Sequence, residues 1–319
     1  MKAKDIKERV EKAHALLEKC VVCPRECKAN RLKEEKGVCG LGSKAVVASY
    51  NVHHGEEPPI SGTKGSGTIF FSGCNLRCVY CQNFPISQMR NGKETSAEGL
   101  ADMMLNLQSK GCHNVNFVTP SHVIPQILEA LSRAWEKGFD LPLVYNTSGY
   151  DSLPPLKLLE GIIDIYLPDM RYSDNSKAKD LSSVEDYVEV NREAVKEMYR
   201  QVGNLVTDQA GVAKKGLIIR HLILPNDLAG SQGTFQFIKR EISERVYLSL
   251  MGQYFPSFRA GEFVSISRKI TPEEYESAVE SFFESGLRRG WMQDSSTLLA
   301  FPRRSRREGT KRAAESMEE

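Results

Sequence analysis

The chain has 319 residues, enough for one sizeable α/β domain with an appendage. Hydrophobic residues make up 40% of it, which is ordinary for a soluble globular protein, and no apolar run approaches the roughly 18 residues that a membrane span requires. Because the formal net charge is only +2, we expect neither a membrane nor a nucleic acid as a partner.

The amino-terminal segment is predicted to begin as an amphipathic helix. Its apolar residues recur at helical spacing within residues 5–19, at Ile6, Val10, Ala13, Leu16 and Leu17. The charged start of the chain has no apolar secretory segment, so we expect a cytoplasmic protein. In that reducing compartment the eight cysteines indicate metal and thiolate chemistry rather than disulfide bridges.

A cysteine-rich module follows this helix. Its four cysteines, which have the spacing C-x2-C-x3-C-x11-C, are Cys20, Cys23, Cys27 and Cys39. Four clustered thiolates with no open position are typical of a closed structural metal site. Zinc and a second [4Fe–4S] cluster both fit this spacing. A cluster would pass electrons inward, whereas zinc would only stabilise a module too small to fold unaided.

From residue 68 onward the sequence alternates short apolar strands with helical stretches. The predicted strands are 68–71, 115–119, 143–146, 162–167, 217–224 and 246–251. The predicted helices start near Ser96, run over 124–137, 184–202 and 235–244, and open a last time at Thr271, which precedes a proline and two glutamates. Six βα units imply a parallel sheet with right-handed crossovers, and because closed barrels need eight, we expect an open, partial barrel.

These patterns divide the chain into three parts. Residues 1–60 form the amino-terminal helix and cysteine-rich metal module, and residues 61–294 form the α/β core. The final segment, 295–319, has almost no apolar residues, so we expect it to be a disordered tail.

A second cysteine motif follows the first predicted strand of the core. It has the spacing C-x3-C-x2-C and consists of Cys74, Cys78 and Cys81. A [4Fe–4S] cube normally takes four cysteine thiolates, so three leave one iron open, and an open position is where a metal site does chemistry. A zinc site would need a fourth ligand, and the next histidine, His113, is distant in sequence.

This motif, at the end of a strand in a βα scaffold, resembles the radical S-adenosylmethionine (radical SAM) superfamily. The resemblance implies a partial (β/α)6 TIM-like barrel, a [4Fe–4S] cluster on the three cysteines, and SAM bound at the open iron. In that superfamily the reduced cluster cleaves SAM and releases a 5'-deoxyadenosyl radical, which abstracts hydrogen.

The resemblance also implies cofactor contacts at positions that match the superfamily. Tyr80, just before the last cysteine, would lie beside the adenine, the alternative being a simple loop anchor, and Asn83 follows it. Thr119 and Ser121 end the second strand, where activating enzymes usually carry a Gly-Gly-Glu turn; here hydroxyl and carbonyl groups would accept from the SAM ammonium instead.

Two further strand ends are polar. The third strand ends in a cluster that includes Asn146 and Ser148, where the superfamily binds the SAM ribose and carboxylate. Asp169 ends the fourth strand, either to orient a substrate or to form a loop salt bridge. Arg220 and His221 interrupt an apolar strand; since neighbours face opposite sides, only one points inward, and we favour Arg220.

A narrower resemblance, to the PflX-type group related to pyruvate formate-lyase activating enzymes, covers roughly residues 15–290. It rests on segments 23–27, 55–62, 67–78, 146–151 and 251–256. It implies a radical SAM oxidoreductase that activates a glycyl radical enzyme, with flavodoxin or ferredoxin as electron donor. The alternatives are a radical SAM enzyme that modifies a small molecule or another protein, and an iron–sulfur carrier without catalysis.

Overall fold

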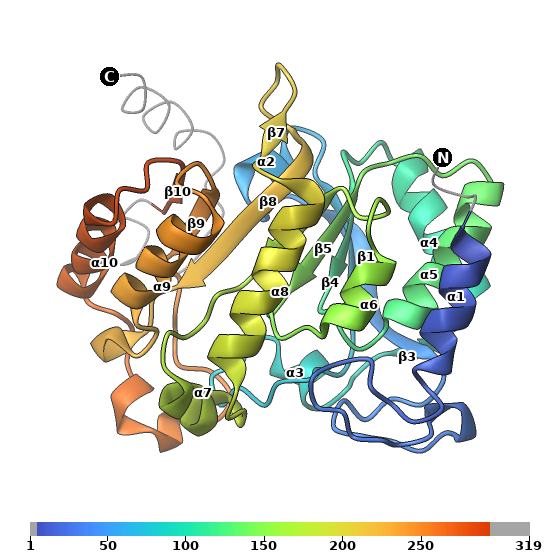
Figure 1. Ribbon diagram of the computed structural model, residues 1–319, viewed down its shortest axis with the longest axis horizontal. Helices are drawn as coiled ribbons and strands as arrows, with labels where there is room; N and C mark the ends of the chain where they lie inside the picture. The colour runs from blue at the N-terminus through green and yellow to red at the C-terminus, as the bar shows by residue number, and fades with distance from the viewer. Residues whose placement is uncertain (1–4, 294–319) are drawn as a thin grey trace.

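A computed structural model describes residues 5–293 of the chain (Figure 1). The predicted tail, 295–319, lies outside the described residues. Ten strands form one sheet, and they are β1 (Ala45–His53), β2 (Ser66–Phe71), β3 (Lys93–Thr95), β4 (Val115–Val118), β5 (Leu143–Thr147), β6 (Ile165–Pro168), β7 (Val206–Thr207), β8 (Ala213–Leu222), β9 (Tyr247–Met251) and β10 (Gly290–Met292). Their order is β10-β9-β8-β6-β5-β4-β2-β1-β3, and β7 pairs with β8 beside this path.

All six predicted strands are confirmed, as β2, β4, β5, β6, β8 and β9. They are neighbours in the sheet and pair in parallel throughout. Across the described residues the strand order ends at β10 and β3 without closing, so the predicted partial barrel is confirmed. β1 and β3 extend it in antiparallel fashion, and β1 does so although it precedes residue 61, where we drew the start of the core.

Helices cover the outer face of this sheet (Figure 1). The longer ones are α1 (Ile6–Ala15), α4 (Ala97–Ser109), α5 (Ile124–Glu136), α8 (Tyr187–Val202) and α10 (Pro272–Glu284). The shorter ones are α2 (Pro58–Ser61), α3 (Phe84–Ser87), α6 (Leu153–Leu158), α7 (Asn175–Ser182) and α9 (Ser231–Phe237). None of the helices within residues 5–293 has both the length and the apolar character needed to cross a membrane.

Local sequence signals account for the helix ends. Thr271 and Glu274 form a reciprocal capping box at the start of α10, as the Thr-Pro-Glu-Glu pattern predicts. The Ser96 side chain accepts from the Gly99 N–H and caps α4. The predicted helix over 184–202 begins at Tyr187, because α7 and a short turn occupy the preceding residues.

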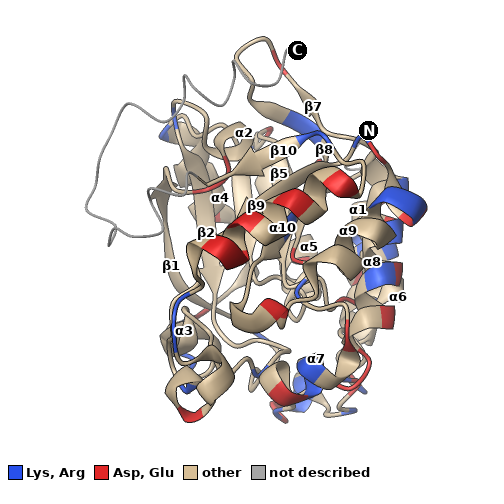
Figure 2. Cartoon of the chain, turned by 90° about the vertical axis from the view of Figure 1, so that its left-hand side faces the viewer, with Lys and Arg blue, Asp and Glu red and all other residues tan. Residues whose placement is uncertain are grey.

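The glutamates of α10 give this helix an acidic outer side (Figure 2). Lysine and arginine are interspersed with acids on α8, where several neighbouring side chains form ion pairs. The overall charge of +2 therefore conceals local differences between neighbouring helices.

The interior of the partial barrel changes character along the strands. A small apolar core fills one end of it, made of Ile60, Val144, Ile165, Leu167, Leu205, Ala213 and Ile218. Side chains two residues apart in a strand share a face. Asn146 and Arg220, each two residues beyond a member of this core, therefore continue the same inner face with polar groups. The carboxyl ends of the strands thus surround a polar space.

Candidate active site

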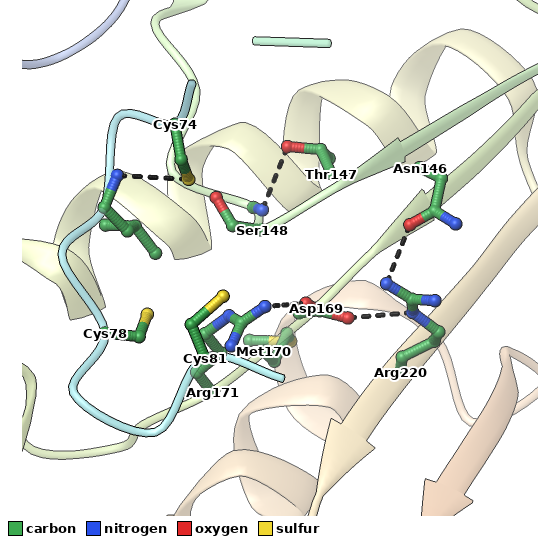
Figure 3. A network of polar contacts seen from close by, with 12 residues as sticks. Cys74, Cys78, Cys81, Asn146, Thr147, Ser148, Asp169, Met170, Arg171 and Arg220 are labelled. Atoms are coloured by element: carbon green, nitrogen blue, oxygen red, sulfur yellow. Dashed lines mark hydrogen bonds and ion pairs between the residues drawn. The ribbon is translucent and has the colours of Figure 1, made fainter. Parts of the chain in front are cut away.

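A cavity of about 410 Å³ lies at the carboxyl ends of the parallel strands. In (β/α) folds this end of the sheet carries the active site. Its walls come from the cysteine loop that follows β2, from α3, from the ends of β4, β5, β6 and β8, and from the loop that contains Glu56. Cys74, Cys78 and Cys81 all contribute to the lining, on one side of the network drawn in Figure 3.

Each of the three sulfurs has a polar neighbour that holds it in place. The backbone N–H of Leu76 donates to Cys74 Sγ at 3.3 Å, and Ser182 Oγ donates to Cys78 Sγ at 3.0 Å. Cys81 Sγ lies 3.0 Å from Ser87 Oγ of α3. These contacts fix the orientation of the three thiols.

The surroundings of the thiols suit metal binding. Burial raises the pKa of Cys74 to about 12 and also raises the pKa of Cys78, where the Arg171 charge opposes the effect of burial. Because metal ligation removes the thiol proton, bound iron would relieve this cost. Among the described residues, no three His, Cys, Asp or Glu side chains converge as the ligands of one ion would. Thiolates that hold a cube bind separate iron atoms and need no such convergence.

A chain of charged groups crosses the cavity (Figure 3). Asp169 pairs with Arg171 on one side and accepts from Arg220 Nε at 2.8 Å on the other. Arg220 Nη2 in turn donates to Asn146 Oδ1 at 2.7 Å. Burial opposes the charge on Arg220, but nearby carboxylates outweigh it and raise its pKa. This network fixes two partly buried cations, of which Arg171 lies nearer the cysteines.

Glu56 lies in the cavity wall near Arg220. Burial, followed by the charge of neighbouring Glu57, raises the pKa of Glu56 to about 7. Asn146 Nδ2 donates to Glu56 Oε2 at 3.3 Å. A carboxyl with this pKa can both give and take a proton near neutral pH.

Five of the seven residues to which the sequence assigns cofactor contacts line the cavity together with the three cysteines. They are Asn83, Thr119, Asn146, Ser148 and Arg220. The orientation of Arg220 is as predicted. His221 Nδ1 instead donates to Met170 O at 2.7 Å, Nε2 lies 3.0 Å from Ser231 Oγ, and the ring packs against Phe235 of α9.

The other two residues, Tyr80 and Ser121, are buried outside the lining. The Tyr80 hydroxyl lies 2.6 Å from that of Tyr172, and its ring contacts Tyr254 edge to face. This arrangement corresponds to the loop-anchor alternative rather than to stacking on an adenine. Ser121 Oγ lies 2.9 Å from the Oγ1 atom of Thr147, the last residue of β5, and so contacts the strand end rather than the cavity.

Sequence patterns assign no role to Arg171 or Glu56, and they leave two roles open for Asp169, a substrate contact or a salt bridge. Asp169 forms salt bridges to two arginines. A signal existed for Glu56, since it lies in the Gly-Glu-Glu-Pro-Pro segment that carries the narrower resemblance. No pattern marks Arg171, whose importance depends on the cysteine loop folding over it.

The four amino-terminal cysteines also come together. Cys20, Cys23 and Cys39 are buried, Cys27 is partly buried, and all four are free thiols. Paired backbone bonds, Cys20 N–H to Ala29 O and Lys28 N–H to Cys20 O, close the loop that carries three of them. Burial raises the pKa of Cys23 to about 12, and the other three thiols lie near enough to add to this rise.

This module packs directly on the cysteine loop of the core. Arg25 Nε donates to Asn75 O at 2.7 Å, and Arg77 donates to Val38 O. Gly73, in the left-handed region at φ +79°, approaches the carbonyl of Cys39 so closely that a Cβ there would lie 2.7 Å from it. The two sets of cysteines are distant in sequence but adjacent in space.

Comparison with known proteins supplies the family. An uncharacterized protein of Methanocaldococcus jannaschii, MJ0674, is 32% identical over 281 residues, which cover 85% of this chain and 76% of that protein. The chain belongs to the family of MJ0674. Within it, residues 61–184 match the family model of a 4Fe-4S single cluster domain, and this segment contains Cys74, Cys78 and Cys81.

Solved structures place the fold of this MJ0674-family chain. The FeFe-hydrogenase maturase HydG from Carboxydothermus hydrogenoformans is 12% identical, with a TM-score of 0.51 over 73% of this chain and 55% of that one. A radical SAM methyltransferase from Sphaerobacter thermophilus is 11% identical, with a TM-score of 0.46 over 71% of this chain and 66% of that one. This chain thus spans about two thirds or less of their lengths. With HydG this chain shares its fold, a mixed α/β partial barrel with a central parallel sheet.

Proposed function

We propose that the protein is a radical SAM enzyme that holds a [4Fe–4S] cluster on Cys74, Cys78 and Cys81. The observation that carries this proposal is that one loop turns three thiols, and no fourth, toward a polar cavity at the carboxyl ends of a parallel sheet. When bound, the cluster supplies the electron that cleaves SAM into methionine and the 5'-deoxyadenosyl radical. The shared fold and the matching cluster-domain model support the assignment.

The cavity also has a group ready for a polar cofactor. Ser148 Oγ is buried in the lining and has no hydrogen-bond partner among the described residues. A buried hydroxyl without a partner is costly, so a ligand that bonds to it is favoured. Asn83, Thr119 and Asn146 present further amide and hydroxyl groups to the same space and would bind the polar parts of SAM.

Arg171 and Glu56 would have different roles in this cavity. Arg171, held by Asp169, places a fixed positive charge beside Cys78 and so favours the thiolate form that binds iron. Glu56 would hold or move a proton on the substrate, since its pKa of about 7 permits both states.

For the substrate we propose a protein, with a glycyl radical enzyme as the first candidate. Exposed aromatic side chains next to the cavity lining support this choice. Phe258 is 42% exposed and stacks on Phe84 of α3, and Phe255 is 45% exposed and follows the lining residue Gln253 closely. Exposed apolar groups beside an active site favour contact with another protein. A flavodoxin or ferredoxin would supply electrons, and a small-molecule substrate is the alternative.

The experiment is anaerobic incubation of the reduced, cluster-loaded protein with SAM, followed by quantitation of 5'-deoxyadenosine. We expect production by the parent and by Cys112→Ala, since Cys112 is a buried cysteine remote from the lining. Cys78→Ala should produce none, because two remaining thiolates would not hold the cube with its one open iron. Parental production by Cys78→Ala would refute the proposal.

A further inference from the structure

The amino-terminal module contains a buried cation that lacks an anionic partner. Arg31 has no solvent-exposed surface, and its guanidinium donates from Nε to Gly42 O at 2.9 Å and from Nη1 to His122 O at 2.7 Å. Its Nη2 has no hydrogen-bond partner, and no carboxylate within residues 5–293 forms an ion pair with it. A buried charge left in this way is expensive unless an anion lies nearby.

The candidates for that anion are the four cysteines, of which Cys20 lies within reach of the Arg31 charge. Arg31 lies between Cys27 and Cys39 in the sequence, and its backbone N–H donates to Leu17 O, shortly before the loop that carries Cys20. Four neutral thiols would leave the arginine uncompensated. Four thiolates bound to a metal centre carry net negative charge and would compensate it.

The arrangement of the sulfurs favours a cluster over a single ion. A zinc site requires thiolates that converge on one point, and no such group exists among the described residues. Cys74, Cys78 and Cys81 do not converge either, as befits ligands of separate iron atoms in a cube. Cys20, Cys27 and Cys39 all lie near enough to Cys23 to act on its thiol, yet among the described residues they form no group that converges on one ion.

We propose that Cys20, Cys23, Cys27 and Cys39 hold a second [4Fe–4S] cluster, which passes electrons to the cluster on Cys74, Cys78 and Cys81. The contact of Cys39 with Gly73, and the bond from Arg77 to Val38, place the two cysteine loops against each other. In each transfer an external one-electron donor protein is oxidised and the second cluster is reduced; the second cluster then returns to its oxidised state as the first is reduced. The metal site stands on its own residues, whereas the transfer rests on the proposed function.

The first test measures the iron content of the protein after anaerobic reconstitution with iron and sulfide. Zinc that remains bound to the purified protein is measured as well. We expect about eight iron atoms per parent chain, twice the ~4 of one cube. Cys23→Ala should keep about half, and so should a Cys74/Cys78/Cys81 triple alanine variant. Cys27→Ser, at a partly buried position, is the second variant should Cys23→Ala not fold, and Cys112→Ala is the matched control with full iron.

Parental iron in folded Cys23→Ala or Cys27→Ser would overturn the second cluster, as would zinc that is lost with these cysteines. These outcomes are distinct from failure of the proposed function, which would appear as unchanged iron and SAM cleavage in the triple variant. The second test is the electron paramagnetic resonance spectrum of the reduced parent. Two adjacent reduced cubes should broaden each other's signals, and the sum of the two single-cluster variants should be narrower. A parent spectrum equal to that sum would overturn the proposed adjacency.

Discussion

The two cysteine loops of this protein carry the same kind of ligand in different surroundings. We call the loop after β2, with Cys74, Cys78 and Cys81, the open site, and the amino-terminal loop, with Cys20, Cys23, Cys27 and Cys39, the closed site. The loop after β2 turns three thiols into a cavity, whereas the amino-terminal loop keeps its four thiols out of the cavity lining. Each loop lies beside an arginine, which is fully buried in the case of Arg31 and partly buried in the case of Arg171. Arg171 is paired with Asp169, but Arg31 bonds only to carbonyls. Protein carboxylates thus balance the charge of Arg171, whereas the charge of Arg31 would be balanced by the cluster that we propose on the amino-terminal cysteines.

The largest expected effect on stability comes from removing the carboxylate that pairs with Arg171 at the open site, because Arg31 at the closed site has no such carboxylate. Asp169→Ala would remove a buried carboxylate and leave the partly buried Arg171 and Arg220 without it. Loss of one partner from a buried ion pair typically costs about 3–5 kcal/mol of folding free energy. We expect a loss of this size in chemical denaturation of the protein.

The control for that measurement is Glu185→Ala, which removes an ion pair with Lys179 that is exposed on both sides. Exposed pairs contribute only about 0–1 kcal/mol. If Asp169→Ala were no more destabilising than Glu185→Ala, the two arginines would not need the carboxylate, and the contrast between the loops would fail.

A smaller effect on stability is expected at Glu56, which lies in the wall of the cavity beside the open site. The pKa of Glu56 is raised from 4.5 to about 7, so between these values the folded protein binds more protons at this site than the unfolded chain. Its contribution to stability is therefore full below pH 4.5 and is lost as the pH rises through 7. Glu56→Gln should remove this loss.

The measurement is the melting temperature of parent and Glu56→Gln between pH 5 and pH 8 at equal metal content. The melting temperature of Glu56→Gln should rise relative to that of the parent as the pH increases. Glu57→Gln offers a matched comparison, because it removes the second cause of the raised pKa and should weaken the pH dependence of Glu56 without abolishing it. If the difference in melting temperature between Glu56→Gln and the parent were the same at every pH, this would contradict the raised pKa of Glu56.

Much of the fold could be predicted because its central strands are short apolar runs that end in polar residues. The strands over 115–118 and 143–147 are buried on both faces, which gives them a clear pattern. β1 was missed because most of its residues are partly or fully exposed, so its sequence lacks a continuous apolar run. The three residues of β10 are too few to show a period.

The candidate site was predictable where a local spacing carries the chemistry, as for the three cysteines. Alternation within β8 shows that only one of Arg220 and His221 points inward, and the need of a buried charge for a partner favours Arg220. The link from Asp169 to Arg220 was not predictable, because it joins two strands separated by a long helix and forms only through parallel pairing. Spacing also could not show that the amino-terminal module packs on the core, since this depends on Arg25 and Arg77 meeting backbone carbonyls.

The most direct test of an open site beside a closed one is the response of each cluster to SAM. The reduced Cys23→Ala variant and the reduced triple variant Cys74/Cys78/Cys81→Ala would each retain one cluster, and electron paramagnetic resonance spectra would be recorded with and without SAM. We predict that SAM shifts the spectrum of Cys23→Ala and leaves that of the triple variant unchanged. A shift in the triple variant, or none in Cys23→Ala, would contradict the account.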